Sequence, residues 1–241
     1  MNDLVARVIA AHGGLDRWNS FQKVTATVVA GGGLIPMKGL ADSPIPRDRT
    51  VMLHEEVSFI SPFGQPDWHM VFTPNRVMIQ TAMGELVSER SDPRAAFKGH
   101  VLETVWDLLH RAYFNGYAIW TYLTTPFFLA MPGFEVTEIA PWQEGEETWR
   151  GLRVRFPDTI ASHSKEQDFY FGDNFLLRRH DYHLEIAGGT PVAQYVYDIV
   201  EADGIRFPTK RRAYVRGSQL QPIHDLLLIS LDLSNFRFTT K

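Results

Sequence analysis

The sequence contains no cysteine among its 241 residues. This absence excludes disulfide bonds, thiolate nucleophiles and every zinc or iron–sulfur site that depends on a cysteine ligand. Positive charge is not in excess either, since 24 lysines and arginines stand against 28 aspartates and glutamates, which gives a net charge of −4. A chain with this balance has no general attraction for a polyanionic backbone. We therefore expect no nucleic-acid partner.

Several motifs that carry chemistry are also absent. The chain has no GxSxG nucleophile motif, and its glycine-rich stretch, Gly31-Gly32-Gly33, is predicted to open a strand rather than a helix that could hold a phosphate. None of its nine histidines stands in HExxH or a comparable metal-binding spacing. We therefore expect neither a metal nor a cofactor.

Residues Met1 to Gly14 lack a basic start, a continuous apolar run and a small-residue cleavage site. On this basis we expect a cytoplasmic protein, or a periplasmic one if a signal peptide has been removed.

The composition, with 44% hydrophobic residues, is that of a folded globular protein. Apolar residues from Leu4 to Trp18 recur at helical spacing, interrupted at Gly13-Gly14, and predict a short helical N-terminus. Alternating patterns then predict strand after strand on both sides of a central segment. The expected strands are 21–30, 34–40, 47–59, 68–72, 75–80, 86–90, 134–139, 148–156, 163–171, 175–186, 192–200, 205–215 and 224–238. Short turns between them favour one continuous antiparallel sheet. We expect a mainly β (α+β) protein, one domain of residues 1–241 with a helical insert at 93–131.

The central segment, 101–131, is unusually aromatic. One helical face carries Trp106, Tyr113, Trp120 and Phe127, and no Asp, Glu, Lys or Arg occurs from Ala112 to Phe134. Prolines and polar residues interrupt the apolar run, so we expect no integral membrane span. Two interpretations remain open: a buried core helix, or an aromatic lid over a cavity of the sheet.

Two groups of residues are candidates for ligand binding. Tyr113, Tyr117 and Trp120 share a helical face, with Trp106 and Phe127 in the same segment. Arg178, His180 and Tyr182 share one face of a predicted strand. A hairpin at 172–174 would bring His163, Lys165, Gln167 and Asp168 close to them, with Lys165 and Gln167 on the face of His180 and Tyr182. That face is either solvated or a polar anchor inside a pocket, and the sequence leaves both readings open.

Two short motifs resemble those of the outer-membrane lipoprotein carriers, the LolA/LolB-like group. One is His12-Gly13-Gly14-Leu15-Asp16-Arg17-Trp18 after the first helix, and the other is the strand–turn–strand sequence from Tyr197 to Lys210, with Asp203-Gly204 at its turn. The resemblance implies a curved antiparallel sheet that forms an unclosed barrel. An N-terminal helix and a central helical lid would plug its concave apolar side. In the carriers that cavity receives acyl chains. Related folds include a cofactor-free enzyme of violacein biosynthesis. This sequence departs from the carriers in having no export signal and no lipoprotein cysteine.

The expected function is binding of an apolar or aromatic small molecule, or a lipid, in the concave cavity. The alternative is a cofactor-independent enzyme of specialised metabolism that uses the same cavity, with Arg178, His180 and Tyr182 as acid, base or anchor. A third possibility is a membrane-surface protein that uses the aromatic segment at the interface. The sequence does not distinguish a binding protein from an enzyme, and it predicts no oligomeric state.

Overall fold

The computed structural model describes residues 2–41 and 44–240. In these residues, 13 strands form one antiparallel sheet with the order β6-β5-β4-β3-β2-β1-β13-β12-β11-β10-β9-β8-β7. The strands are β1 (Phe21–Gly31), β2 (Arg47–Met52), β3 (Ser58–Ser61), β4 (Trp68–Thr73), β5 (Arg76–Thr81), β6 (Leu86–Ser91), β7 (Glu135–Glu144), β8 (Glu147–Arg155), β9 (Glu166–Phe171), β10 (Leu177–Leu184), β11 (Thr190–Ala202), β12 (Ile205–Arg216) and β13 (Pro222–Thr240). The two strand-rich halves therefore form one continuous sheet, as the turn pattern predicted.

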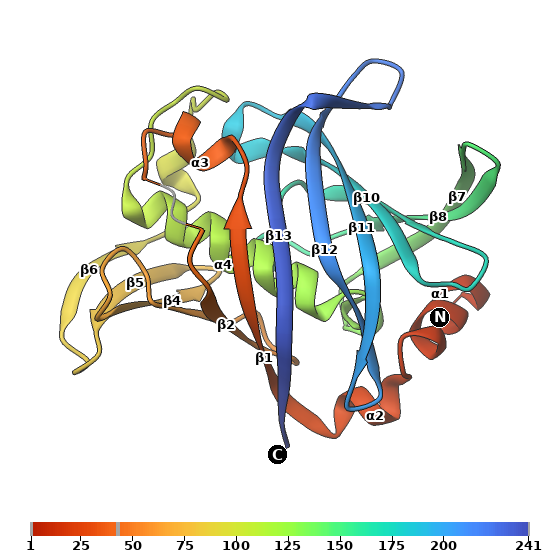
Figure 1. Ribbon diagram of the computed structural model, residues 1–241, viewed down its shortest axis with the longest axis horizontal. Coiled ribbons are helices and arrows are strands. Elements are labelled where there is room, and N and C mark those ends of the chain that lie inside the picture. Colours follow the sequence, from red (N-terminus) through yellow and green to blue (C-terminus); the bar gives the residue numbers. More distant parts are fainter. Residues whose placement is uncertain (1, 42–43, 241) are drawn as a thin grey trace.

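The sheet is strongly curved and does not close on itself (Figure 1). Its halves meet where β1 pairs with β13, with Phe21 opposite Thr240. The first half runs from β1 to the free edge β6, and the second runs from β13 to the free edge β7. Buried Val24, Ala26 and Val28 alternate along β1, which explains why this strand keeps one face toward the core. The expected mainly β fold with an unclosed antiparallel sheet is confirmed.

The helices are short except for one. They are α1 (Asp3–Ala11), α2 (Leu15–Asn19), α3 (Leu34–Met37) and α4 (Leu108–Thr124), with 3₁₀ turns η1 (Ala95–Phe97), η2 (Phe127–Ala130) and η3 (Glu185–Ala187). The predicted strand at 34–40 is wrong, because this stretch forms α3 and a turn. Pro36 cannot donate to a sheet ladder, and Gly39 adopts a φ of 74° that reverses the chain.

The two motifs that carry the family resemblance touch each other. The Arg17 Nε donates to the Asp203 carbonyl at 2.7 Å, and the Arg206 N–H donates to the His12 carbonyl at 3.0 Å. Gly13 must lack a side chain, because a Cβ there would lie 2.3 Å from the Gly204 carbonyl oxygen. The turn residues of both motifs thus hold α1 and α2 against the β11–β12 hairpin.

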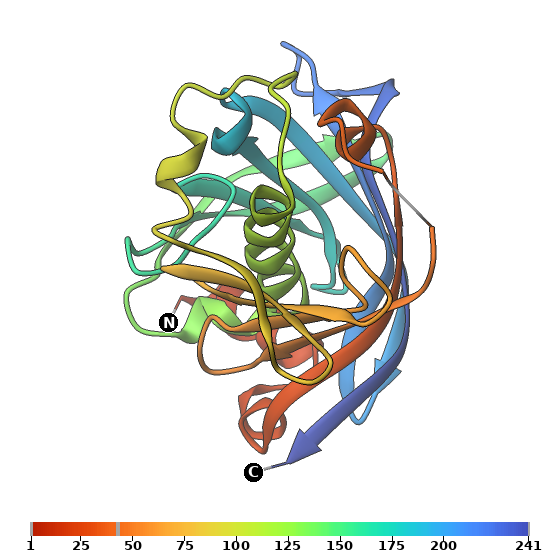
Figure 2. The same cartoon turned by 90° about the vertical axis from the view of Figure 1, so that its left-hand side faces the viewer.

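Helix α4 lies inside the curve of the sheet, which surrounds it in Figure 2. It begins later than the aromatic pattern predicted, at Leu108, because Asp107 caps it: the Asp107 carboxylate accepts from the His110 N–H at 2.8 Å. Every residue from Gly116 to Thr124 is buried. The aromatic segment is therefore a plug that fills the concave side.

Candidate functional site

One side of α4 packs tightly against the first half of the sheet. Gly116 faces Phe72 of β4 so closely that a Cβ there would lie 2.2 Å from the Phe72 ring. The Trp120 indole N–H donates to the Met52 and Glu55 carbonyls at 3.0 and 2.8 Å, which pins the helix to the β2–β3 turn. Trp120 therefore serves as a core anchor on this side.

The other side of α4 faces the second half through a buried group of polar and aromatic side chains. The Tyr117 hydroxyl lies 3.2 Å from the His163 Nδ1, and the Tyr122 hydroxyl lies 2.9 Å from the His163 Nε2. The Tyr182 hydroxyl lies 3.4 Å from that of Tyr122, and the Tyr182 ring stacks on His163 at 3.9 Å. We call this group the interior polar cluster; its members are Tyr117, Tyr122, His163, Gln167, His180, Tyr182, Gln194 and Arg211.

The remaining members complete the cluster from β9 to β12. The His180 Nε2 donates to the Gln167 side-chain oxygen at 2.6 Å, while the His180 ring stacks on Phe169 at 4.1 Å. Arg211 donates to the Gln194 side-chain oxygen at 2.9 Å and to the Tyr122 carbonyl at 2.8 Å. Arg211 thereby ties β12 to α4.

Burial sets the charge state of the cluster. Loss of hydration lowers the pKa of His163 and of His180 well below 6.5, so both imidazoles are neutral at physiological pH. Burial also lowers the pKa of Arg211 to about 10, which still leaves its guanidinium charged. Its two hydrogen bonds to other residues, among those the structure describes, end on neutral oxygens. The cluster therefore holds a buried cation whose hydrogen bonds do not neutralise it.

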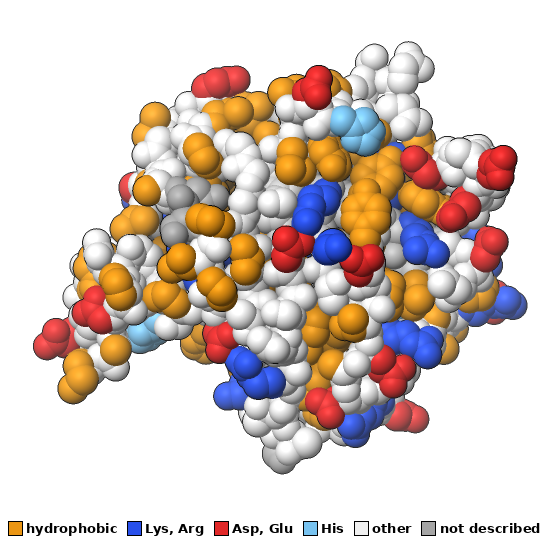
Figure 3. All heavy atoms as spheres, viewed as in Figure 1, with side chains coloured by type: hydrophobic (Ala, Val, Ile, Leu, Met, Phe, Trp, Pro, Cys, Tyr) orange, Lys and Arg blue, Asp and Glu red, His pale blue; other side chains and the backbone are white. Residues whose placement is uncertain are grey.

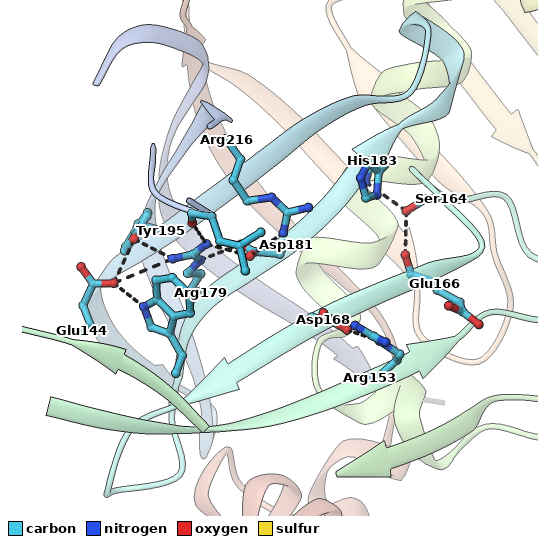
Figure 4. Close-up of polar contacts among 12 residues, drawn as sticks. Glu144, Arg153, Ser164, Glu166, Asp168, Arg179, Asp181, His183, Tyr195 and Arg216 are labelled. Atoms are coloured by element: carbon cyan, nitrogen blue, oxygen red, sulfur yellow. Dashed lines mark hydrogen bonds and ion pairs between the residues drawn. The ribbon is translucent and has the colours of Figure 1, made fainter. Parts of the chain in front are cut away.

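The structure answers which face of β10 points inward. His180 and Tyr182 lie in the interior polar cluster, whereas Arg179 and Asp181 lie on the outer face of the sheet (Figure 4). There Arg179 donates to both carboxylate oxygens of Asp181, at 2.6 and 2.7 Å, and its guanidinium lies 4.2 Å from the centre of the Trp142 ring. The buried ion pair of the outer face is thus separate from the cluster inside.

Two cavities adjoin α4. A narrow one of about 20 Å³ lies between α4 and the sheet, with an apolar wall from residues such as Ile35, Phe114 and Leu231 and with Tyr122, Arg49 and Arg111 also in its lining. A second, of about 460 Å³, opens beside Tyr113 and is lined by Arg94, Ser162 and Glu185 among others. We call the first the inner cavity and the second the seam cleft. His163, which contacts both Tyr117 and Tyr122, is thus linked through Tyr122 to the lining of the inner cavity.

The predicted site residues are only partly brought together. Tyr117, His180 and Tyr182 are members of the interior polar cluster, and Tyr113 borders the seam cleft. Trp106 precedes α4 and packs on Phe114 with ring centres 5.5 Å apart, while Phe127 stacks on Trp18 at 4.1 Å, next to α2.

Arg178 does not share the face of His180 and Tyr182, and that prediction is wrong. A β-bulge between Leu177 and Arg179 shifts the alternation, and the Arg178 side chain lies over Gly172. Lys165 is also outside the cluster, because it is exposed and pairs with Asp158.

Sequence reasoning missed Tyr122 and Arg211 as site residues. It placed His163 close to His180 and Tyr182, but on a predicted strand and without a role in the site; in the structure His163 lies in the loop before β9. Arg211 offered a signal, because it falls on the apolar face of β12 with Phe207 and Ala213, between the outward-facing Lys210 and Arg212.

The outer face of β11–β13 carries charged and hydrophobic side chains side by side (Figure 3). Lys210 pairs with Asp198 at 2.6 Å and Arg212 with Asp232 at 2.7 Å, beside exposed Tyr197 and Leu226. Among residues 2–41 and 44–240, no helix combines the length and hydropathy needed to cross a bilayer. In the same residues, no three His, Asp or Glu side chains come close enough to hold a metal ion.

Comparison with protein-family models gives no match, and neither does comparison with curated proteins. Solved structures do match. A LolA superfamily protein from Nitrosomonas europaea has a TM-score of 0.53 and 8% identity, over 98% of this chain and 93% of that one. A putative outer membrane lipoprotein-sorting protein domain from Vibrio parahaemolyticus has a TM-score of 0.55 and 8% identity, over 98% and 91%. A DUF1329 family protein from Desulfovibrio piger has a TM-score of 0.52 and 11% identity, over 98% and 90%.

Proposed function

Starting from the LolA-like fold of this chain, we propose that it binds an apolar small molecule or lipid with an acidic head group in the space between α4 and the concave sheet. The observation that carries this proposal is the interior polar cluster, and above all Arg211. A cation with only 2% of its surface exposed, whose hydrogen bonds end on neutral oxygens, is costly to bury. An anionic ligand would offset that cost.

The inner cavity supports the same ligand class. Its apolar side chains suit an acyl or aromatic body, while Arg49, Arg111 and Tyr122 supply polar atoms at its wall. The Arg211 guanidinium lies 4.6 Å from the centre of the Tyr122 ring, so this cation is next to a side chain of the wall. An acid that reaches Tyr122 would therefore experience an attractive potential.

The cavity volume sets a condition on binding. About 20 Å³ leaves room for no more than one water molecule. A ligand would enter only when elements that cover the cavity move apart. The expected partner is therefore a hydrophobic molecule that replaces internal contacts as it binds.

Two measurements test the proposal. Mass spectrometry of the natively purified protein would identify any retained acid or lipid. Titration with 11-(dansylamino)undecanoic acid, against its neutral methyl ester, would test the head-group preference, and we expect the acid to bind at least about tenfold more tightly, which corresponds to about 1.4 kcal/mol.

Arg211→Gln should remove that preference for the acid over the ester. Arg150→Gln is the matched control, because Arg150 is exposed and pairs with Glu138 on the outer side. Equal affinity of the wild type for acid and ester would contradict the acidic head group, and binding of neither probe would contradict the binding function.

The alternative function is a cofactor-independent enzyme that uses the same space. It is favoured by one observation, namely that neutral His163 lies within hydrogen-bonding distance of two tyrosine hydroxyls. A bound compound recovered in two chemical forms, with the product form lost in His163→Gln, would support an enzyme. Recovery of one unchanged compound from both proteins would support a binder.

A further inference from the structure

The seam cleft, of about 460 Å³, shares no lining residue with the inner cavity. The β4–β5 turn and the segment after β6 contribute to its wall from one half of the sheet. The loop between β8 and β9 and the turn η3 contribute from the other half, and Tyr113 of α4 completes the lining. These segments lie on the open side of the curved sheet (Figure 2). A cleft of this volume is typical of sites for small molecules.

The charged side chains of the seam cleft do not balance. Its lining holds two cations and three carboxylates: Arg94, Lys165, Asp92, Asp158 and Glu185. Arg94 pairs with Glu185, and Lys165 pairs with Asp158. Within residues 2–41 and 44–240, the Asp92 carboxylate forms no ion pair. The described lining therefore carries one negative charge that no cation of the cleft offsets.

The backbone holds Asp92 in place between two other lining residues. The Asp92 N–H donates to the Asn75 carbonyl at 2.9 Å, and the Asp92 carbonyl accepts from the Ala95 N–H at 3.1 Å. Its φ of 46° is a left-handed conformation, which aspartate and asparagine adopt more readily than other residues with a side chain. The carboxylate is thus carried by a fixed turn at the wall of the cleft.

A second acid, Glu56, borders the same cleft. Its Oε2 accepts at 2.8 Å from the N–H of Ala161, a lining residue, whereas its buried Oε1 has no hydrogen-bond partner in the part of the chain that the structure describes. Burial raises the pKa of Tyr113, and the nearby carboxyl groups of Glu56 and Asp92 raise it further, so both acids lie near this hydroxyl. A ligand anion here would be repelled by Asp92, whereas an ammonium group is complementary to both acids.

The remaining wall of the cleft is largely apolar. Its apolar residues are Pro74, Ala95, Phe156, Pro157, Ile160 and Ala161. Such a wall gains free energy when it covers a hydrocarbon group. The cleft therefore combines an unpaired carboxylate with a surface for an apolar body.

We infer that the seam cleft binds a small organic amine, with the ammonium group at Asp92 and the hydrocarbon body against the apolar wall. This second site is independent of the binding function proposed for the inner cavity. Since Arg94 and Lys165 already have carboxylate partners, the cleft offers charge for one ammonium group. The ligand class is therefore a monoamine with an aromatic or aliphatic body.

Calorimetric titration with phenethylamine and with 3-phenylpropionate tests the charge preference, because both probes carry the same phenylethyl group. We expect the amine to bind at least about tenfold more tightly than the acid. In nitrogen-15 spectra of the protein, phenethylamine should shift the amide signals of Ala95 and Ala161 and leave that of Ile223 in β13 unchanged. Equal binding of both probes would overturn the amine class. No binding of the amine, or shifts confined to other regions, would overturn the site.

Asp92→Asn removes the charge at the centre of this inference. Asparagine accepts the same left-handed backbone, so the fold should be kept. We expect the affinity for phenethylamine to fall at least about tenfold. Asp173→Asn is the matched control, because Asp173 is exposed in the turn before β10 and lies outside the cleft. An unchanged affinity in Asp92→Asn, or an equal loss in both variants, would overturn the role of Asp92.

Ala95→Trp tests the location by filling the cleft from an exposed position of its lining. We expect it to lower the affinity for phenethylamine at least about tenfold, whereas Ala82→Trp, at an exposed position outside the cleft, should not. An unchanged affinity in Ala95→Trp would contradict the placement of the amine.

The two sites are told apart with 11-(dansylamino)undecanoic acid. Neither Asp92→Asn nor Ala95→Trp should change its binding. If the wild type binds phenethylamine but not the dansyl acid, the function proposed for the inner cavity fails and the seam cleft stands. If it binds the dansyl acid but not phenethylamine, the inference for the seam cleft alone is overturned.

Discussion

The two halves of the sheet hold the same helix by different means. Toward β2–β6 the backbone of α4 runs close to the strands, with Gly116 against Phe72 and the Ser58 hydroxyl donating to the Gly116 carbonyl at 2.8 Å. Toward β9–β12 the space is filled by long side chains that meet through hydroxyl, imidazole and guanidinium groups. The first side resembles an ordinary protein core, and the second resembles the lining of a binding site.

The two sides of α4 differ in how much their contacts contribute to the stability of the fold. Apolar packing at short distance gains free energy whenever the chain folds. Buried polar groups gain little net free energy and are costly when any partner is lost. Two histidines and an arginine lie beneath the central helix on the second side, and these buried polar groups are the observation on which the proposed binding function rests.

The largest expected effect comes from Trp120 on the packed side. Trp120→Ala should lower the free energy of unfolding by roughly 3–5 kcal/mol, because it removes a fully buried indole and leaves a cavity. Denaturant unfolding measures this, and the loss should be the same with and without added ligand. Tyr197→Ala, at an exposed position, should change stability by less than about 0.5 kcal/mol. A comparably small change for Trp120→Ala would remove the distinction between the two sides.

The second-largest expected effect is a loss of stability in acid, which arises from buried histidines. Burial lowers the pKa of His12 from 6.5 to about 4, so the unfolded chain binds the proton more readily than the folded one. Stability should therefore be constant above pH 6.5 and fall as the pH drops toward 4, by about 3 kcal/mol from His12 alone at 1.36 kcal/mol per pKa unit. His163 and His180, whose pKa values are also lowered by burial, act in the same direction.

Denaturant midpoints at pH 7, 5.5 and 4.5 check this dependence. His12→Asn should make it shallower by the share of His12, because an amide can still donate to the Val8 carbonyl, which the His12 Nδ1 reaches at 2.8 Å, but does not titrate. His224→Gln, at an exposed position, should leave it unchanged. A flat pH profile in the wild type would contradict the neutral buried histidines.

Gly116→Ala tests the close contact on the packed side. In an isolated helix this change would gain about 1 kcal/mol. Here the added Cβ would lie 2.2 Å from the Phe72 ring, so we expect a net loss of about 1–3 kcal/mol in the free energy of unfolding. The double variant Gly116→Ala/Phe72→Leu should recover part of it. A gain in stability from Gly116→Ala would show that α4 is not pressed against β4.

The smallest effect is expected within the interior polar cluster. Tyr117→Phe removes the hydroxyl that lies 3.2 Å from the His163 Nδ1 and should cost about 1 kcal/mol, because the ring still fills its space. Thermal unfolding, with Tyr197→Phe as the exposed control, measures the difference. If Tyr117→Phe costs as much as Trp120→Ala, the two sides of α4 do not differ in kind.

The sequence could predict those features that follow a regular pattern along the chain. Alternation with a period of two found most strands, because a half-buried strand shows it wherever the core lies, and the charge-free run from 112 to 134 found the buried helix. Such patterns fail where local geometry breaks the period: the bulge at Arg178 moved that residue off its predicted face, and Pro36 with Gly39 turned a predicted strand into α3. The sequence placed Gln167 on one face with His180 and Tyr182. The contact of this face with α4 was out of reach, because His163 meets Tyr117 across 46 positions of sequence.

The pairing of β1 with β13 also has a consequence for biogenesis. Strand β1 pairs on one side with β13 (Pro222–Thr240), which is the last strand of the sequence. The two halves of the sheet therefore cannot join until β13 has been translated. Until then the nascent chain displays the aromatic residues of α4 without their full cover, and contacts of such long sequence separation form slowly. Chaperone dependence, and aggregation when translation stops before β13, are therefore expected of this fold.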